Sequence, residues 1–132
     1  MKNKTRLVTF VILATTLAFL LASGGCAPAP KPGEPSVMLD KKVYAPGEMI
    51  TVTFTASPSY QTNAWIGIIP SDVPHGDEAV NDQHDIAYQY LDGMTAGALM
   101  FNAPTAPGSY DMRMHDTDSS GIEVASVTFK VK

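Results

Sequence analysis

The chain has little of what several common functional classes need. Only one of its 132 residues is a cysteine, which excludes a disulfide framework and any zinc or redox site built on a Cys-x-x-Cys motif. Between Asp72 and Glu123 there are ten acidic residues and a single basic one, Arg113. That region therefore lacks the clustered lysines and arginines of a nucleic-acid-binding surface, and its charge disfavours docking on anionic lipid. We expect no nucleic-acid partner.

The sequence also lacks the motifs of common enzymes. It contains no Gly-x-Ser-x-Gly elbow, no His-Glu-x-x-His pair and no phosphate-binding loop, and residues 36–132 hold no cysteine nucleophile. Two His-Asp pairs occur, at residues 84–85 and 115–116, but neighbouring side chains of an extended chain point to opposite faces. We expect a protein without catalytic residues and without a required cofactor.

Residues 1–25 have the organisation of an export signal. Three basic residues come first, an uncharged apolar run of 16 residues covers Leu7 to Ala22, and small residues follow. This run is shorter than the roughly 20 residues that a membrane-spanning helix needs, which favours a signal peptide over a transmembrane anchor. Removing the segment takes Lys and Arg from 9 to 6 and leaves all 13 acids, so the rest of the chain carries a net charge of −7.

The residues that lead to Cys26 resemble a bacterial lipobox. Leu21 to Gly25 (LASGG) ends at the only cysteine, and the resemblance implies that the thiol of Cys26 is acylated and anchors the protein to a membrane of the bacterial envelope. Two acyl chains hold a protein stably where one chain is marginal. The alternative is cleavage nearby by an ordinary signal peptidase, which would leave a free thiol. Residues 26–35 then form a linker with four prolines, and the extended polyproline conformation of its nine residues 27–35 predicts a reach of about 28 Å.

Residues 36–132 predict one all-β domain. Apolar and polar residues alternate over 48–56, 110–115 and 124–131, which is typical of half-buried strands in antiparallel sheets that pack face to face. About seven short strands at this spacing predict an immunoglobulin-like antiparallel β-sandwich. The other expected strands cover 36–40, 64–69, 86–91 and 98–102, with turns at 45–47, 92–93, 104–108 and 119–121.

A series of short motifs runs through this domain in a fixed order. Tyr44-Ala45-Pro46-Gly47 precedes Trp65-Ile66-Gly67-Ile68, then come Tyr88 and Tyr90, Phe101 to Pro104, Pro107 to Tyr110, Asp116 to Gly121 and Ala125 to Phe129. The order resembles the SKICH domain over about two-thirds of the chain. The resemblance implies a module for protein interaction or membrane recruitment, not an enzyme. Its signature positions are Tyr44, Pro46, Gly47, Trp65, Gly67, Tyr110, Gly121 and Phe129; Trp65 fits the buried tryptophan of such cores and Tyr110 a tyrosine that begins a late strand.

The segment DTDSSG is the first candidate metal site. Asp116, Asp118 and Ser120 place oxygens at positions 1, 3 and 5, and Gly121 follows, as in a calcium-binding loop. Glu123 occupies position 8, but position 12, where such loops carry a bidentate glutamate, is Val127. The alternative is a simple hairpin turn, because Asp, Ser and Gly are also the residues that turns favour.

The acidic segment 72–85 is the second candidate metal site, for zinc, copper or another divalent ion. The alternatives are an exposed acidic loop or one helical turn over 78–82. If residues 64–69 pair antiparallel with 110–115, His115 lies at the Trp65 end of the sandwich, about 15–20 Å from where the segment leaves it. We therefore expect no three-histidine site unless the segment folds back, and we expect Met112 and Met114 to pack inward. The candidate ligands are His75, Asp77, Glu78, Asp82, His84 and Asp85.

These patterns together predict an exported, membrane-anchored envelope lipoprotein with three parts: a signal at 1–25, a lipidated linker at 26–35 and a β-sandwich at 36–132. The predicted function is non-catalytic binding of a protein or envelope polymer, through loops or an exposed edge strand. The alternative function is binding of calcium or another divalent metal at one of the two candidate sites.

Overall fold

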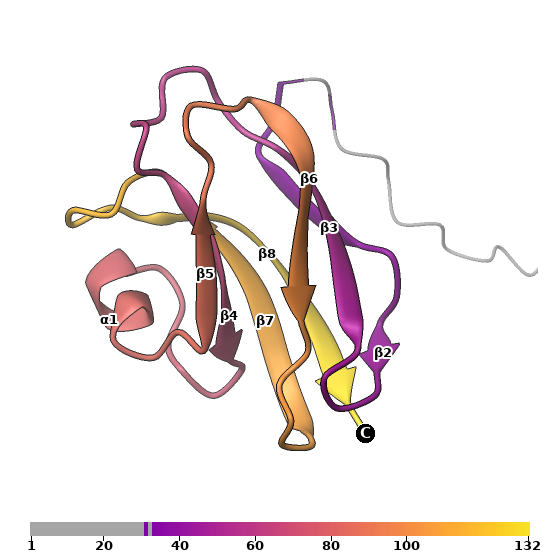
Figure 1. The fold of residues 1–132 in the computed structure, drawn as a ribbon. Helices are drawn as coiled ribbons and strands as arrows, with labels where there is room; N and C mark the ends of the chain where they lie inside the picture. The colour runs from indigo at the N-terminus through magenta and orange to yellow at the C-terminus, as the bar shows by residue number, and fades with distance from the viewer. Residues whose placement is uncertain (1–30, 32) are drawn as a thin grey trace, which may run out of the picture.

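A computed structural model describes residue 31 and residues 33–132 (Figure 1). The predicted export signal and Cys26 lie outside the described residues. The end of the linker forms a turn in which the Glu34 amide donates to the Lys31 carbonyl at 3.0 Å. In the part of the chain that is described, no helix has the length and apolar character needed to cross a membrane.

Each of the seven predicted strands is confirmed, and so is the helical turn at 78–82. One short strand, β2, was not predicted; it pairs parallel with the last strand of the chain. The elements are β1 (Ser36–Leu39), β2 (Val43–Tyr44), β3 (Met49–Thr55), β4 (Trp65–Pro70), α1 (Glu78–Asp82), β5 (Ala87–Tyr90), β6 (Ala96–Asn102), β7 (Gly108–His115) and β8 (Glu123–Val131).

The strands form two sheets, one in the order β1-β3-β6 and the other in the order β2-β8-β7-β4-β5. Apart from β2 with β8, every pairing is antiparallel. The two sheets lie face to face (Figure 1), and their inward side chains meet in one apolar core, so the predicted all-β sandwich is confirmed. Met112 and Met114 lie in this core as expected. Its largest members include Tyr44, Ile50, Phe54, Ile66, Ile68, Met112, Met114 and Phe129.

Two tyrosines of the signature pack against Phe129 inside the sandwich. The ring of Tyr44 meets Phe129 edge-on at a centroid distance of 5.7 Å, and the ring of Tyr110 stacks on it at 5.8 Å. The Tyr110 hydroxyl donates to the Ala106 carbonyl at 2.9 Å. It therefore ties the start of β7 to the turn before it, while its ring adds to the core.

The central strands β4 and β7 are buried on both faces. Their inner face lies in the sandwich core, and their outer face is covered by residues 71–86, a segment we call the insert, which carries α1 (Figure 1). A strand covered on both faces is expected to be continuously apolar, and Trp65–Ile69 meets that description. The insert thus folds back over the sheet, which was the stated exception to the expected separation of His115 from residues 72–85.

Trp65 is buried, but not where the sequence analysis placed it. Its side chain is 1% exposed and packs with Ile69 and Val73 on the outer face of the sheet, under the insert. Gly67 makes room for the indole, since a Cβ there would lie 2.6 Å from the Trp65 ring and 3.1 Å from the Ala87 carbonyl. The expectation that Trp65 belongs to the inter-sheet core is therefore wrong, because alternation along β4 gives the inner positions to Ile66 and Ile68.

Candidate functional site

The insert is held to β7 by the guanidinium of Arg113, which is 0% exposed. Its Nη2 donates to the Val73 carbonyl at 2.8 Å and to the Asp111 carboxylate at 2.7 Å. Its Nη1 donates to the Pro74 carbonyl at 3.0 Å and to the side-chain oxygen of Asn81. One arginine therefore bonds to two backbone carbonyls of the insert, a side chain of α1 and the Asp111 carboxylate, which is more acceptors than the three N–H groups of a lysine could serve.

Asp111 supplies the negative charge that balances Arg113. Burial raises the pKa of its carboxyl, but hydrogen bonds from Arg113, Thr128 and Ser71 outweigh burial and hold the pKa below its usual value. The hydroxyls of Ser71 and Thr128 donate to the Asp111 carboxylate at 2.9 and 2.8 Å. The buried pair of Arg113 and Asp111 supports the insert structurally, since all its hydrogen-bond donors and acceptors are used in contacts inside the protein.

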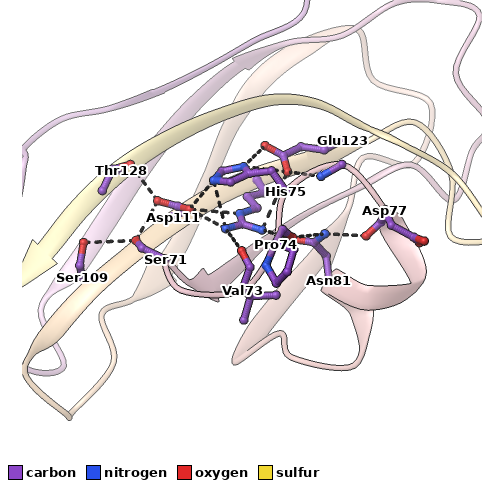
Figure 2. Close-up of polar contacts among 12 residues, drawn as sticks. Ser71, Val73, Pro74, His75, Asp77, Asn81, Ser109, Asp111, Glu123 and Thr128 are labelled. Atoms are coloured by element: carbon purple, nitrogen blue, oxygen red, sulfur yellow. Dashed lines mark hydrogen bonds and ion pairs between the residues drawn. The ribbon is translucent and has the colours of Figure 1, made fainter.

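His75 and Glu123 close the same network at the protein surface (Figure 2). The Nδ1 of His75 lies 2.8 Å from Glu123, and its Nε2 lies 3.3 Å from Asp111. Glu123 also accepts the Gly76 amide at 3.2 Å. Burial raises the pKa of Glu123, but the hydrogen bond from His75 helps to keep the net pKa below its usual value. Thus one residue from each candidate metal site is used to fasten the insert.

Three other predicted ligands also have structural partners. Asp77 is the N-cap of α1 and accepts the Ala79 amide at 2.9 Å. The Nδ1 of His84 lies 2.8 Å from the Val80 carbonyl at the far end of the same helix. Asp116 accepts the Ile122 amide at 2.8 Å within its turn. These contacts explain the residue types without a metal ion.

Gly121 lets the turn of residues 116–121 pack closely, both within itself and on the insert. A Cβ at this position would lie 2.5 Å from the Asp116 carboxylate and 2.7 Å from the Thr117 carbonyl. The Gly121 carbonyl accepts the Glu78 amide at 3.2 Å, and the Gly121 amide donates to the Glu78 carboxylate at 3.3 Å. The glycine is therefore required by close approach, and the turn is joined to the first residue of α1.

Glu78, Asp82 and Asp118 form a carboxylate cluster. Neither of the two candidate metal sites contained all three of these residues. One ligand atom from each of the three lies within 4.8 Å of the other two. Among the described residues, no other group of three His, Cys, Asp or Glu side chains comes together in this way. The predicted calcium loop of Asp116, Asp118, Ser120 and Glu123 is not assembled as such, and neither is a site of His75 with His84. The cluster instead takes one residue from the turn and two from the insert.

Among residue 31 and residues 33–132, no base forms an ion pair with the carboxylate cluster to balance its negative charge. Glu78 is only 3% exposed, and burial, followed by the charges of Asp118 and Asp82, raises the pKa of its carboxyl. Burial and the same two charges raise the pKa of Asp85. Arg113 is committed to Asp111. The cluster is therefore electrostatically suited to a positively charged group.

An exposed aromatic surface borders this cluster on strand β5. We call Ile86, Tyr88 and Tyr90 the aromatic edge; they are 50%, 50% and 36% exposed. Tyr88 meets both Trp65 and Tyr90 edge-on, at centroid distances of 6.1 and 5.4 Å. The Tyr90 hydroxyl donates to Asp118, and this hydrogen bond raises the pKa of the phenol. Apolar, aromatic and acidic groups thus lie together at one edge of the larger sheet.

A hollow of about 570 Å³ lies where the insert meets the turn after β7. It is lined by Gly76, Asp77, Ala79 and residues 120–123. The carboxylates of Asp77 and Glu123 are already bonded to α1 and to His75. The hollow could therefore receive a ligand by its shape, but among the described residues it presents no charged group that is free to bind one.

His115 lies at the Trp65 end of the sheet, as the predicted strand pairing required. Its ring stacks on the indole at a centroid distance of 4.1 Å, and both of its nitrogens are buried without a hydrogen-bond partner among the described residues. Burial lowers its pKa to about 4. No three-histidine site is formed in this part of the chain, because His75 and His84 have other partners.

In comparisons with protein-family models, with curated proteins and with solved structures, the chain matches none of them.

Proposed function

We propose that this chain is a lipoprotein of the bacterial envelope, held in a membrane through an acylated Cys26. Its β-sandwich is a non-catalytic module that binds a partner at the aromatic edge. The observation that carries this proposal is the exposure of two tyrosines on β5, the outermost strand of the larger sheet, and of Ile86 just before that strand. Tyrosine is enriched where proteins bind one another, because its ring gives contact area and its hydroxyl gives a hydrogen bond.

The module is of the immunoglobulin-like class, with a departure from it on β4. The Tyr110 hydroxyl bonds to the backbone four residues upstream, as in the tyrosine corner of immunoglobulin-like sandwiches. The departure is Trp65, which packs on the outer face under the insert. The insert is thus an addition to the sandwich, and it places the carboxylate cluster beside the aromatic edge.

Anchoring through Cys26 is tested by cell fractionation. We expect the natural protein in the membrane fraction and the Cys26→Ala variant in the soluble fraction, because two acyl chains give stable membrane attachment and the substitution removes their attachment point. Mass spectrometry of the purified protein should show a diacylated N-terminal cysteine. A Cys26→Ala variant that stays with the membrane contradicts lipid anchoring.

Binding at the aromatic edge is tested in the same cells with a photo-crosslinking residue. At position 88 we expect a discrete adduct, and at Thr53, an exposed residue on the outer face of the other sheet, we expect none. Equal labelling at both positions, or no adduct at either, contradicts binding at the aromatic edge.

A second candidate function is binding of a divalent cation. We propose it because Glu78, Asp82 and Asp118 bring ligand oxygens within 4.8 Å of one another and because carboxylates are the ligands that calcium prefers. Asp85, whose pKa is raised by burial and then by the charges of Asp82 and Asp118, is a fourth carboxylate within electrostatic reach. A bound cation would act against the burial and the repulsion that together raise the pKa of Glu78.

The metal proposal predicts a calcium-dependent melting temperature. With millimolar calcium the natural protein should melt higher than in EDTA, and Glu78→Gln and Asp118→Asn should each abolish the difference. Without metal, Glu78→Gln should melt higher than the natural protein at pH 7, because a buried carboxylate that lacks a cationic partner is replaced by a neutral amide. Asp72→Asn, an exposed acid outside the carboxylate cluster, is the control and should keep the calcium effect. No shift with calcium, or a shift that survives in Asp118→Asn, contradicts the metal proposal.

A further inference from the structure

We propose that the free edge of β5 takes up an extended, basic segment of a partner protein as an additional strand of the larger sheet. This inference rests on the proposed binding module and names the chemistry of its partner.

The backbone of β5 has one side turned away from the sheet. β5 is the last strand in the order β2-β8-β7-β4-β5. The Leu91 amide donates to the Ala64 carbonyl at 2.7 Å, and Gln89 stands opposite Ile66. Because hydrogen-bonding residues alternate along an antiparallel strand, the N–H and C=O groups of Tyr88 and Tyr90 point away from β4. A strand that arrives from outside can pair with them, as in recognition by β-augmentation.

This edge lacks two of the devices that usually prevent such pairing, charged side chains and prolines. Edge strands are commonly protected by charged side chains, prolines or bulges, and Ala87–Tyr90 (AYQY) contains no charge and no proline. The edge of the neighbouring strand β6 is partly covered, because the Gln89 side chain donates to the outward carbonyl of Met100 at 2.6 Å. A side chain of β5 thus occupies the edge of β6, whereas no residue of the described part of the chain pairs with the outer backbone edge of β5.

Charge complementarity selects a basic occupant. The aromatic edge lies beside Asp118, which accepts the Tyr90 hydroxyl. Asp118 in turn lies with Asp82 and Glu78 in the carboxylate cluster, and the one base of residues 72–123 is buried in its pair with Asp111. Lysine or arginine side chains of an added strand would stand over the tyrosine rings and next to these carboxylates. A second copy of the chain would bring the same acids to the same surface, so like charges oppose self-association.

The test uses the full-length protein in non-ionic detergent and short labelled peptides, with binding followed by fluorescence anisotropy. A peptide that alternates lysine and valine should bind, and added salt should weaken it. The same peptide with glutamate for lysine should not bind. A version N-methylated at every amide keeps charge and side chains but has no N–H group to donate from either edge, so it cannot pair as a strand and should bind at least roughly tenfold more weakly.

Variants separate the backbone from the side chains. Tyr88→Ala keeps the outward amide and loses only the ring, while Tyr88→Pro also removes the amide, which an edge strand tolerates when that amide faces solvent. We expect Tyr88→Pro to weaken binding more than Tyr88→Ala. Replacing both Asp82 and Asp118 by asparagine should weaken the lysine peptide roughly tenfold, whereas Asp72→Asn should leave its affinity unchanged.

The outcomes distinguish this inference from the proposed function. Suppose that the crosslinker at position 88 captures a partner, but the lysine and glutamate peptides bind alike or N-methylation has no effect. Strand addition by a basic segment is then wrong, while the binding module stands. An adduct between two copies of the chain overturns the basic partner in favour of self-association. No adduct together with no peptide binding overturns both proposals.

Discussion

Arg113→Met is expected to lower the free energy of unfolding by about 3–5 kcal/mol, the usual cost of breaking a buried ion pair from one side. Arg113 is fully buried, and its loss leaves the Asp111 carboxylate without its counter-charge. It also leaves the carbonyls of Val73 and Pro74 without their donor. Each buried polar group that loses its partner adds to the cost. Denaturant unfolding followed by circular dichroism measures this change.

Two further variants test whether the buried ion pair is the cause. Lys130→Met changes an exposed base on the neighbouring strand β8 and should alter stability by less than about 0.5 kcal/mol. The double variant Arg113→Met, Asp111→Leu removes both charges and should recover part of the loss, because replacing a whole buried pair costs less than breaking it. Hydrogen exchange should rise first at the Asn81 amide, which belongs to the insert. A loss below 1 kcal/mol in Arg113→Met, about the effect of an ordinary point mutation, would show that Arg113 does not hold the insert.

The strands could be predicted because their signal is local. In β3, Ile50, Val52 and Phe54 face the core while the threonines between them face outward, and a period of two residues is visible without knowledge of the partner strand. The helical turn α1 was also within reach, since Asp77 stands where an N-cap is expected. β2 was missed because a strand of two residues is too short to show any period.

The fold-back of the insert was not predicted, although the sequence held two signals of it. Trp65 to Ile69 is apolar without alternation, which indicates burial on both faces of β4 and hence a second cover. Arg113 is the single base in a region with ten acids, and an isolated base on a central strand needs a buried partner. Besides Asp111 and Asn81, its partners include the backbone carbonyls of Val73 and Pro74, and backbone carbonyls leave no trace in the sequence.

The carboxylate cluster escaped prediction because it is divided between two segments. Motif spacing compares residues within one loop, and so the turn with Asp118 and the insert with Glu78 were treated as separate candidates. They meet because Gly121 pairs with the first turn of α1 through two hydrogen bonds. Only the path of the insert across the sheet makes this contact possible, and that path is a property of the tertiary fold.

Acid is expected to destabilise the protein through His115, with an effect second only to the loss of Arg113. Its pKa is about 4 in the folded chain against 6.5 for the free side chain. Below pH 6.5 the unfolded chain binds a proton that the folded chain does not, so stability is lost as the pH falls from 6.5 towards 4. The full effect is about 3 kcal/mol, reached below pH 4. The physical cause is burial, since neither ring nitrogen has a hydrogen-bond partner among the described residues.

His115→Phe isolates this contribution, because a phenyl ring can keep the stack on Trp65 but binds no proton. Asp111 and Glu123 have lowered pKa values, so their protonation also destabilises the protein in acid, mainly at lower pH. Glu78 and Asp85 have raised pKa values, so their protonation has the opposite effect on the stability of the protein. All four are present in both proteins, so the difference between the two unfolding free energies at pH 7, 6, 5 and 4 reports His115 alone. We expect that difference to shift in favour of His115→Phe as the pH falls. Parallel curves for the two proteins would mean that His115 gains a proton as easily in the folded chain as in the unfolded one, which its burial against Trp65 opposes.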